Sequence, residues 1–331
     1  MGAGRTRASS APKARKSARA TGRLLVATIK PLVQALLVLA IVATAVFALL
    51  RLVPGDAAVL ILGDQASPED LAKLRHRLGV DRPLYVQYMH FVQGLLRLDL
   101  GDSLRRPGTP AFARVAVAFP PTAALAGTAT GIGALVGTAL AVACAGPFLG
   151  RYRGALGRAL DGVAATPLLS FAPVVTYVLC VRLRVLPLPG DGAQPLVGLV
   201  FASTLLAIPL SAAVARTGRV ALEDIARLPF LSVARAKGRS RLVAFVLHGV
   251  PAVSGPLLTV VGAQLGALLG GAVVLERLFE RPGLGSLILD AYASRDLPVL
   301  EAAIVSAAAL FVLAQSLAQS CHALIDPRVR R

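Results

Sequence analysis

The chain has 331 residues, 56% of them hydrophobic, and its mean hydropathy is +0.70. A soluble domain of this size is less apolar, so the composition excludes an ordinary globular enzyme or binding module and predicts a membrane protein. The formal net charge of +18 is typical of nucleic-acid-binding proteins. Here the charges lie in short segments between apolar stretches, so we expect no nucleic-acid partner.

Six charge-free stretches are long enough to cross a bilayer, which takes about 20 apolar residues. They occupy residues 31 to 50, 115 to 150, 162 to 181, 192 to 215, 242 to 275 and 302 to 325. The second is too short for two crossings, so we expect one helix with an interfacial extension. The predicted transmembrane helices are 24–52, about 117–143, 160–181, 195–216, 250–275 and 302–325. The predicted fold is an all-α integral membrane protein, a bundle of six transmembrane helices.

Basic residues gather in four segments of the chain. These are the N-terminal tail, Arg151 to Arg158, Arg216 to Arg241, and Arg328 to Arg331. With six spans all four lie on one side, which the positive-inside rule makes cytoplasmic; Arg182 and Arg184 are a minor exception. We expect a multi-pass cell-membrane protein with both termini in the cytoplasm, a disordered tail at 1–22 and a short C-terminal tail at 326–331. A cleaved signal peptide is the alternative at the N-terminus, but the first apolar stretch has full spanning length.

Residues 53–114 form the one substantial polar segment, and by this topology they lie outside. A Ser-Pro-Glu-Asp sequence from Ser67 predicts a helix start, and Gly79 predicts its end. The next residues, VDRPLYVQYMHFVQGLLRLDLGDSL, predict a second, amphipathic helix. Its aromatic residues either pack on the domain or sit at the membrane interface: Tyr85, Tyr88 and Phe91.

The basic segment between the fourth and fifth spans contains the signals of another short helix. Pro229 suits the first position of a helix and Gly238 the residue after its end, so the predicted helix runs from Pro229 to about Lys237. Its apolar face comprises Phe230, Val233 and Ala234. From the residues alone, this face either docks on a partner protein or lies on lipid headgroups.

This segment resembles the cytoplasmic coupling loop in permease subunits of ABC importers, most closely the dipeptide, oligopeptide and nickel branch. That branch has Tyr-x-Arg-Thr-Ala-Arg-Ala-Lys-Gly where this chain has FLSVARAKG. Phe230, Ser232 and Val233 replace the Tyr, Arg and Thr, and Pro229 replaces an acidic residue. The resemblance implies a helix that couples to an ATPase subunit through Pro229, Phe230, Ser232, Val233, Ala234, Arg235, Ala236, Lys237 and Gly238.

Further segments carry the same resemblance. LGVDRPLYVQY and LDLGDS are similar to LGLDxPLxxQY and GDLGxS in the external domain of that family. VLERLFERPGLGSLILDAYASRDLPVLEAA resembles ETVFALPGLGRLLVDAIFARDYPVV. The resemblance covers about residues 30–331 and implies the type I importer permease fold, with an external helical domain at 53–114, a transmembrane domain at 115–325 and a coupling loop at 217–249. It also implies four partners: ABC ATPase subunits, a second homologous permease subunit in a heterodimer, an extracytoplasmic solute-binding protein, and membrane lipid.

The sequence lacks the usual motifs of catalysis and nucleotide binding. It has no GxxxxGK[ST] loop, GxSxG elbow or HExxH helix, so we expect no catalytic residue and no cofactor, and ATP hydrolysis belongs to partner subunits. Its three cysteines and four histidines are scattered without metal-ligand spacing, so no metal site is expected. The six apolar stretches contain no carboxylate, which disfavours a proton-coupled carrier.

Polar and small residues inside the predicted spans favour packing roles. The second and fifth spans carry rows of glycine that indicate close helix contacts: Gly127, Gly131, Gly133, Gly137, Gly262, Gly266 and Gly270. Pro167 and Pro173 predict kinks in the third span. On the sixth span, Gln315, Gln319 and His322 share a face and either line a pathway or bond across helices.

Two functions remain open at this point. The first is a passive permease subunit that forms half of a translocation pathway for peptides, nickel or related small solutes. The second is a non-ABC carrier or membrane scaffold whose basic loop binds lipid. The resemblance favours the first, and it leaves the cargo and the substrate-binding residues open.

Overall fold

The computed structural model describes residues 33–52, 59, 66–146, 150–190 and 194–325. Over these residues the chain is helical, apart from turns and a single β-bridge between Asp102 and Pro110. The tails predicted at 1–22 and 326–331 lie outside the described residues.

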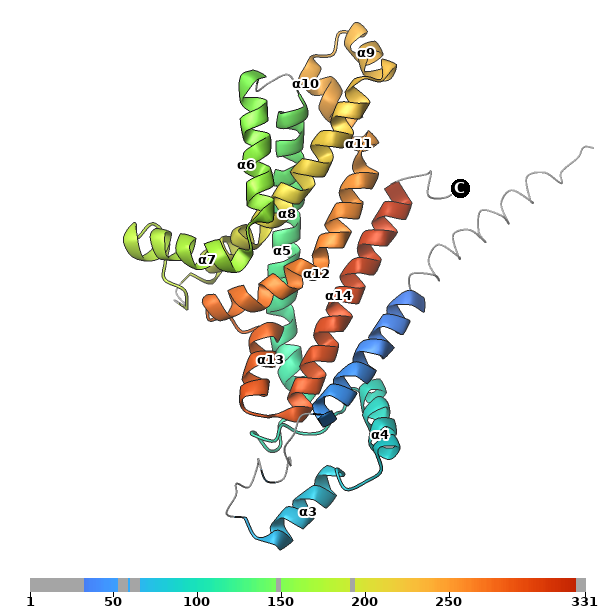
Figure 1. Ribbon diagram of the computed structural model, residues 1–331, viewed down its shortest axis with the longest axis vertical. Helices are drawn as coiled ribbons and strands as arrows, with labels where there is room; N and C mark the ends of the chain where they lie inside the picture. Colours follow the sequence, from blue (N-terminus) through green and yellow to red (C-terminus); the bar gives the residue numbers. More distant parts are fainter. Residues whose placement is uncertain (1–32, 53–58, 60–65, 147–149, 191–193, 326–331) are drawn as a thin grey trace, which may run out of the picture.

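Within the described residues, five helices are long and apolar enough to cross a membrane. They are the first helix Val33–Leu52, α5 Ala111–Ala145, α8 Pro195–Ala226, α12 Ser254–Leu278 and α14 Leu297–Ile325. They run along the long dimension of the molecule (Figure 1). A sixth crossing is broken into α6, Arg153–Ala165, and a second piece formed by α7, Leu168–Thr176, and the π-helix η2, Tyr177–Arg182. Counting this pair as one span gives the six predicted crossings.

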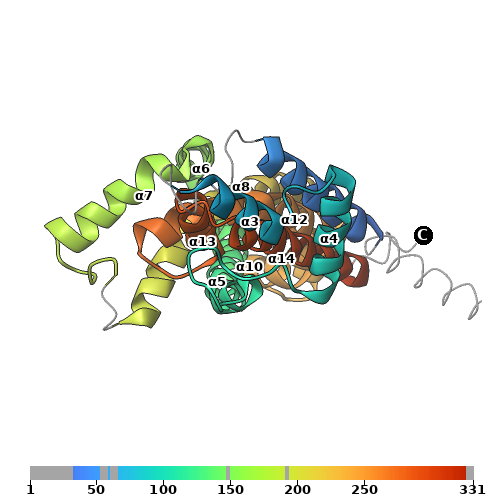
Figure 2. The same cartoon turned by 90° about the horizontal axis from the view of Figure 1, so that it is seen from below.

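The third span departs from the single helix predicted at 160–181. It starts earlier, and it bends by 101° at Thr166 and Pro167. Thr166 has a ψ of 122°, the extended conformation that a residue before proline adopts, and Pro167 lacks the N–H needed to continue the helix. Pro173, by contrast, lies inside α7 without ending it. Figure 2 shows α7 projecting from the side of the bundle.

Hydropathy located the crossings but not the ends of the helices. Helix α5 starts at Ala111 rather than near 117, and α8 continues past 216 to Ala226. Charged residues such as Arg219 and Glu223 extend α8 beyond its apolar part, because a helix does not stop where the bilayer does.

The core of the bundle lies between α5 and α8, where glycines allow a close approach. A Cβ atom at Gly133 would lie 2.5 Å from Leu210 Cδ2, and one at Gly137 would lie 2.7 Å from the Ser211 carbonyl oxygen. The predicted packing role is therefore confirmed at these two positions. At Gly127 and Gly131, and at Gly270 on α12, a Cβ would meet nothing within 4 Å, so these glycines are not required for packing within the described chain. On α12, Gly262 and Gly266 face Gln315 and Phe311 of α14.

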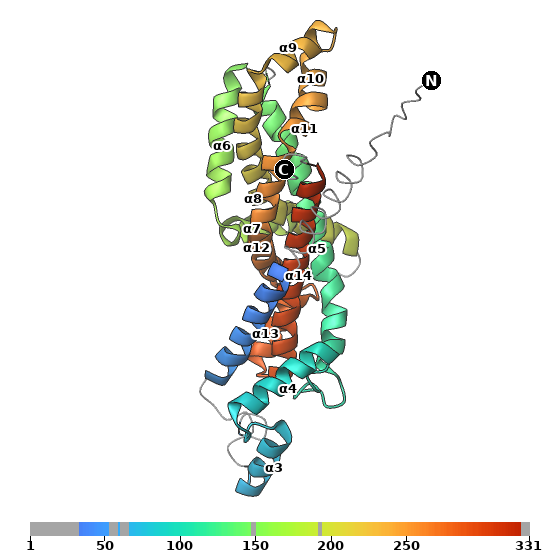
Figure 3. The same cartoon turned by 90° about the vertical axis from the view of Figure 1, so that its right-hand side faces the viewer.

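Short helices occupy the two ends of the bundle. At one end lie α3, Pro68–Leu78, α4, Leu84–Arg97, and α13, Leu284–Ala293. At the opposite end lie α9, Pro229–Ala236, and α10, Arg241–Ala244 (Figure 3). The predicted start of α3 is confirmed, since Ser67 Oγ accepts a hydrogen bond from the Asp70 N–H at 3.1 Å. Gly79 ends α3 with a φ of +67°, as predicted.

Candidate functional site

Helix α9, Pro229–Ala236, lies at the end of the bundle opposite α3 and α4 (Figure 1). Only Arg227 and Leu228 separate it from α8, and both donate backbone hydrogen bonds to carbonyls in the last turn of α8 at 3.3 and 2.9 Å. Gly238 follows α9 with a φ of +84°, as a residue that ends a helix does. The predicted short helix is therefore present, and it is joined to α8 by a two-residue, hydrogen-bonded connection.

The exposed face of α9 differs from the predicted docking face. Val233 is 52% exposed, whereas Ala234 is 8% exposed and belongs to the same buried cluster as Ala244 and Phe245. The prediction that Ala234 faces outward is wrong, because the following segment folds back onto α9. Of the other predicted residues, Pro229, Ala236, Lys237 and Gly238 are exposed, and the side chains of Phe230, Ser232 and Arg235 lie outside the described ones.

The segment after α9 returns to the bundle as a nearly continuous helix. It consists of α10 Arg241–Ala244, the π-helix η3 Phe245–Gly249 and α11 Val250–Ala252. Ser240 Oγ caps it by accepting the Val243 N–H at 3.3 Å. A Cβ at Gly249 would lie 3.3 Å from Leu222 Cδ2, so this segment packs closely on α8. The region predicted as a loop at 217–249 is therefore mostly helical.

Exposed apolar side chains surround α9 at this end of the molecule. Leu228 is 46% exposed, Leu242 48% and Leu247 52%. Apolar side chains gathered at one end of a molecule are typical of a contact with a protein or a membrane.

Helix α6 braces the end of α8 that leads to α9. Arg153 of α6 forms an ion pair and hydrogen bond with Glu223 of α8. The guanidinium of Arg219 lies over Gly157, where a Cβ would be 2.0 Å from its Nη1. The two helices are thus joined at this end by an ion pair and a close side-chain contact.

Three buried carboxylates lie toward the opposite end of the bundle. Glu276, Asp296 and Glu301 are 1%, 0% and 7% exposed. Sequence reasoning missed them, because Glu276 and Glu301 directly flank apolar stretches and were assigned to their ends. Both lie inside helices, in α12 and α14. The one sequence signal for Glu276 and Glu301 is that the helical pattern continues past each of these charges.

Glu276 connects α12 to α5 and to the start of α13. Its carboxylate accepts hydrogen bonds from the Thr122 hydroxyl of α5 and from the Ser286 N–H at 3.0 Å. Thr122 Oγ1 in turn accepts the Leu284 N–H at 2.7 Å. A Cβ at Gly283 would lie 2.1 Å from Glu276 Cδ, so the turn before α13 needs glycine there.

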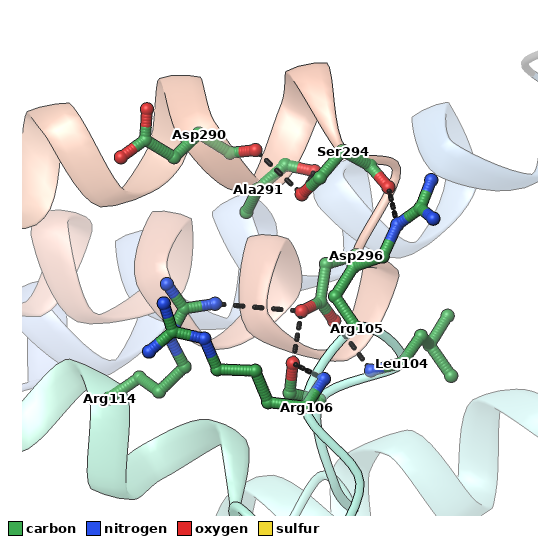
Figure 4. Close-up of polar contacts among 9 residues, drawn as sticks. Leu104, Arg105, Arg106, Arg114, Asp290, Ala291, Ser294 and Asp296 are labelled. Atoms are coloured by element: carbon green, nitrogen blue, oxygen red, sulfur yellow. Dashed lines mark hydrogen bonds and ion pairs between the residues drawn. The ribbon is translucent and has the colours of Figure 1, made fainter.

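Asp296, the residue before α14, binds the segment that precedes α5 (Figure 4). It accepts hydrogen bonds from the Ser103 hydroxyl and from the Leu104 N–H at 3.0 Å, and Arg114 Nη1 lies 3.6 Å away. Arg105 Nε donates to the nearby Ser294 carbonyl at 2.8 Å. Two of the sequence motifs, LDLGDS and the ASRDLP part of the third region, therefore meet at this carboxylate.

Glu301 connects α14 to the first helix. It pairs with Arg51, whose guanidinium also lies 3.8 Å from the centre of the Phe47 ring. Each of the three carboxylates thus attaches a different part of the N-terminal half to the C-terminal helices.

The described residues contain no group of three or more histidine, cysteine, aspartate or glutamate side chains that suits a metal ion. On α14, Gln315 Oε1 is buried without a hydrogen-bond partner in the described part of the chain. Gln319 is exposed, and the side chain of His322 lies outside the described ones.

Two family descriptions match the chain. "Binding-protein-dependent transport system inner membrane component" matches residues 122–331, and the N-terminal membrane component of the same systems matches residues 24–113. The boundary between them falls at the start of α5, beside the Asp296 contacts.

Similar proteins include transporter permeases. A probable peptide ABC transporter permease protein, y4tP, of Sinorhizobium fredii is 31% identical over 312 residues, covering 91% of this chain and 98% of the relative. The glutathione transport system permease protein GsiC of Salmonella typhimurium is 33% identical over 296 residues, covering 88% and 94%. GsiC of Escherichia coli is 32% identical over 306 residues, covering 91% and 98%. The chain thus belongs to the family of inner membrane components of binding-protein-dependent transport systems.

Proposed function

We propose that this permease component forms half of a translocation pathway for peptides and related small solutes, and that α9 couples it to separate ATPase subunits. The peptide cargo is supported by the names of the relatives, one a peptide permease and others permeases for glutathione, itself a small peptide. The coupling role is supported by one observation above all: α9 sits at the tip of the bundle and follows α8 after two residues.

The surface around α9 suits a protein partner better than water. Val233, Leu228 and Leu242 are each about half exposed, and burying such side chains in a groove contributes roughly 25 cal/mol per Å² of apolar surface. The basic residues of this segment suit a protein partner as well as anionic lipid headgroups, because α9 projects beyond the bundle. A scaffold or carrier with a lipid-binding loop is therefore less favoured than a subunit docked on α9.

The mechanism that follows is a lever. Closure of two ATPase subunits on ATP displaces α9, and the short connection passes the displacement to α8. Because Arg153 ties α6 to α8 and Gly249 packs on Leu222, the neighbouring helices move with it. The pathway then changes the side on which it is open.

The remaining partners act at other surfaces. A second, homologous permease subunit completes the pathway in a heterodimer, and an extracytoplasmic solute-binding protein delivers the cargo at the end that carries α3 and α4. We place α9 and both termini in the cytoplasm, on the distribution of basic residues along the chain.

The docking role is tested by Val233→Asp. A charge at an exposed position leaves the fold intact but is unpaired once buried in an interface, so affinity for the ATPase subunit falls about tenfold or more. Val80→Asp is the matched control, since Val80 is 40% exposed and lies between α3 and α4. Ala234→Asp is unsuitable, because it places a charge in the chain's own core. Copurification of the ATPase with Val233→Asp at the wild-type level would contradict the proposal.

A further inference from the structure

One flank of α4 is apolar and uncovered by the described chain. Tyr85, Met89 and Leu96 are 73%, 59% and 82% exposed. Their spacing places them on one side of the helix. Gln87 and His90 lie on the other side, where Gln87 donates a hydrogen bond to the Arg82 carbonyl at 2.8 Å and His90 Nε2 lies 3.0 Å from Arg82 Nη1. Besides the face packed on the bundle, α4 thus has an apolar flank and a polar flank.

The packed face of α4 contacts transmembrane helices well inside their length. Phe91 shares a buried cluster with Ala43 of the first helix and Val305 of α14. The Tyr88 hydroxyl lies 2.8 Å from Thr44 Oγ1. Figure 3 shows α4 against the lower end of the first helix.

The ion pair between Arg51 and Glu301 marks the level at which the charged end of the bundle begins. Thr44 lies seven residues before Arg51 and Val305 four residues after Glu301. At 1.5 Å per residue these contacts are about 10 and 6 Å deeper in the bundle. Helices that lie in a membrane interface bury their apolar side about 5–10 Å below the headgroup boundary, so α4 sits at the depth of such a helix.

The first helix also exposes apolar side chains at this end of the bundle. Leu49 and Leu52 are 62% and 76% exposed at the same end of the bundle. Tyr85 supplies an aromatic ring with a polar tip, the kind of side chain that concentrates where acyl chains meet headgroups.

We propose that α4 is an interfacial helix, whose flank of Tyr85, Met89 and Leu96 contacts the acyl chains of the outer leaflet. The segment 53–114, predicted as an external domain, is then partly a membrane-contacting one. Lipid contact at α4 then holds α3, and the segment that Asp296 binds, at a fixed height above the bilayer. The inference rests on the crossings alone and is independent of the coupling role of α9.

The absence of tryptophan from the chain provides the test. Met89→Trp and His90→Trp introduce single fluorophores at the same depth but on different sides of α4, and both positions are exposed. The full-length chain is reconstituted in phosphatidylcholine vesicles with and without lipids brominated on the acyl chain. We expect Met89→Trp to lose at least about twice the fraction of its emission that His90→Trp loses. Tyr85→Trp serves as a second variant on the flank and behaves like Met89→Trp.

An aqueous quencher, iodide, separates the alternatives. Under the proposal it quenches His90→Trp more strongly than Met89→Trp. Equal quenching by iodide at both positions means that the flank faces water and overturns the proposal. Protection of Met89→Trp from both quenchers means that protein covers the flank, which overturns it as well.

Discussion

Asp296 accepts a hydrogen bond from Ser103 although 193 residues separate them in the chain. The carboxylate is fully buried and Ser103 is 2% exposed, so water does not replace either partner of this hydrogen bond. The contact holds the segment before α5 against the turn between α13 and α14, with the Leu104 N–H and Arg114 as further partners (Figure 4). A buried carboxylate with this many donors is costly to remove, because each donor then loses its acceptor.

Asp296→Ala is expected to lower the stability of the protein by about 3 kcal/mol or more, since it leaves Arg114 and a buried N–H without their partner. Thermal unfolding of the reconstituted chain measures the loss. Asp296→Asn is the milder control, because an amide oxygen still accepts hydrogen bonds. In a double-mutant cycle with Ser103→Ala, the two residues should show a coupling of about 1–3 kcal/mol. Additive losses would show that the contact contributes nothing.

Gly283→Ala is expected to destabilise the turn before α13 by about 1–3 kcal/mol, because the new Cβ would displace the Glu276 carboxylate from Thr122. The matched control is Gly270→Ala, where a Cβ meets nothing within 4 Å. That control should be neutral or stabilising by up to about 1 kcal/mol, since it only reduces backbone freedom in a helix. In a Glu276→Ala background the Gly283→Ala penalty should largely disappear, and a penalty of the same size there would refute the steric explanation.

The close contact between α5 and α8 leads to another prediction that compares two glycines. Gly137→Ala should cost about 1–3 kcal/mol, because its Cβ would overlap the Ser211 carbonyl and Val214. Gly131→Ala, on the same helix but with open space around it, should cost nothing. Melting temperatures of the two variants in the same lipid provide the comparison; equal values would contradict the packing described for α5 and α8.

Glu223→Gln tests whether α6 and α8 move together. The pair with Arg153 is about 40% exposed on each side, so its contribution to stability is only about 0–1 kcal/mol and the fold should survive. We expect less solute transported for each ATP hydrolysed by the assembled transporter, because the brace between the helices is weakened. The exchanged pair Arg153→Glu with Glu223→Arg should recover part of the loss. Unchanged transport per ATP would exclude a role for the brace.

The connection between α3 and α4 should respond to acid. The hydrogen bond with His76 holds the pKa of Asp81 below its ordinary value of 3.8. A carboxylate with a lowered pKa stabilises the folded state above its unfolded pKa, and the contribution is lost as the pH falls through the lowered value. Hydrogen exchange in this connection should therefore be faster in Asp81→Asn than in the wild type at about pH 6, and the two should converge as the pH falls well below the ordinary pKa of 3.8. A constant difference across this range would contradict the assignment.

The sequence predicted much of the fold because the signals involved were local. Six apolar stretches reveal six crossings, and Ser67 and Gly79 delimit a helix through contacts with near neighbours. Pro229 and Gly238 delimit α9 in the same way. The bend at Pro167 was underestimated, since local signals indicate a break but not its angle.

The missed features depend on contacts between distant segments. Glu276 and Glu301 resemble charges at the ends of spans until Thr122 and Arg51 are seen to approach them. The helical pattern of α9 places Ala234 on its apolar face, but the packing of α10 against that side is visible only in the structure. A single sequence carries no record of such pairings, so the candidate docking face was only partly predicted.

The partnership of Arg51 and Glu301 also bears on how the protein is made. The two residues are 250 positions apart, and a ribosome adding about 5–20 residues per second takes roughly 12 to 50 s to cover that distance. Throughout that interval Arg51 has been synthesised and its partner Glu301 has not. The ion pair that attaches the first helix to α14 therefore forms only near the end of synthesis.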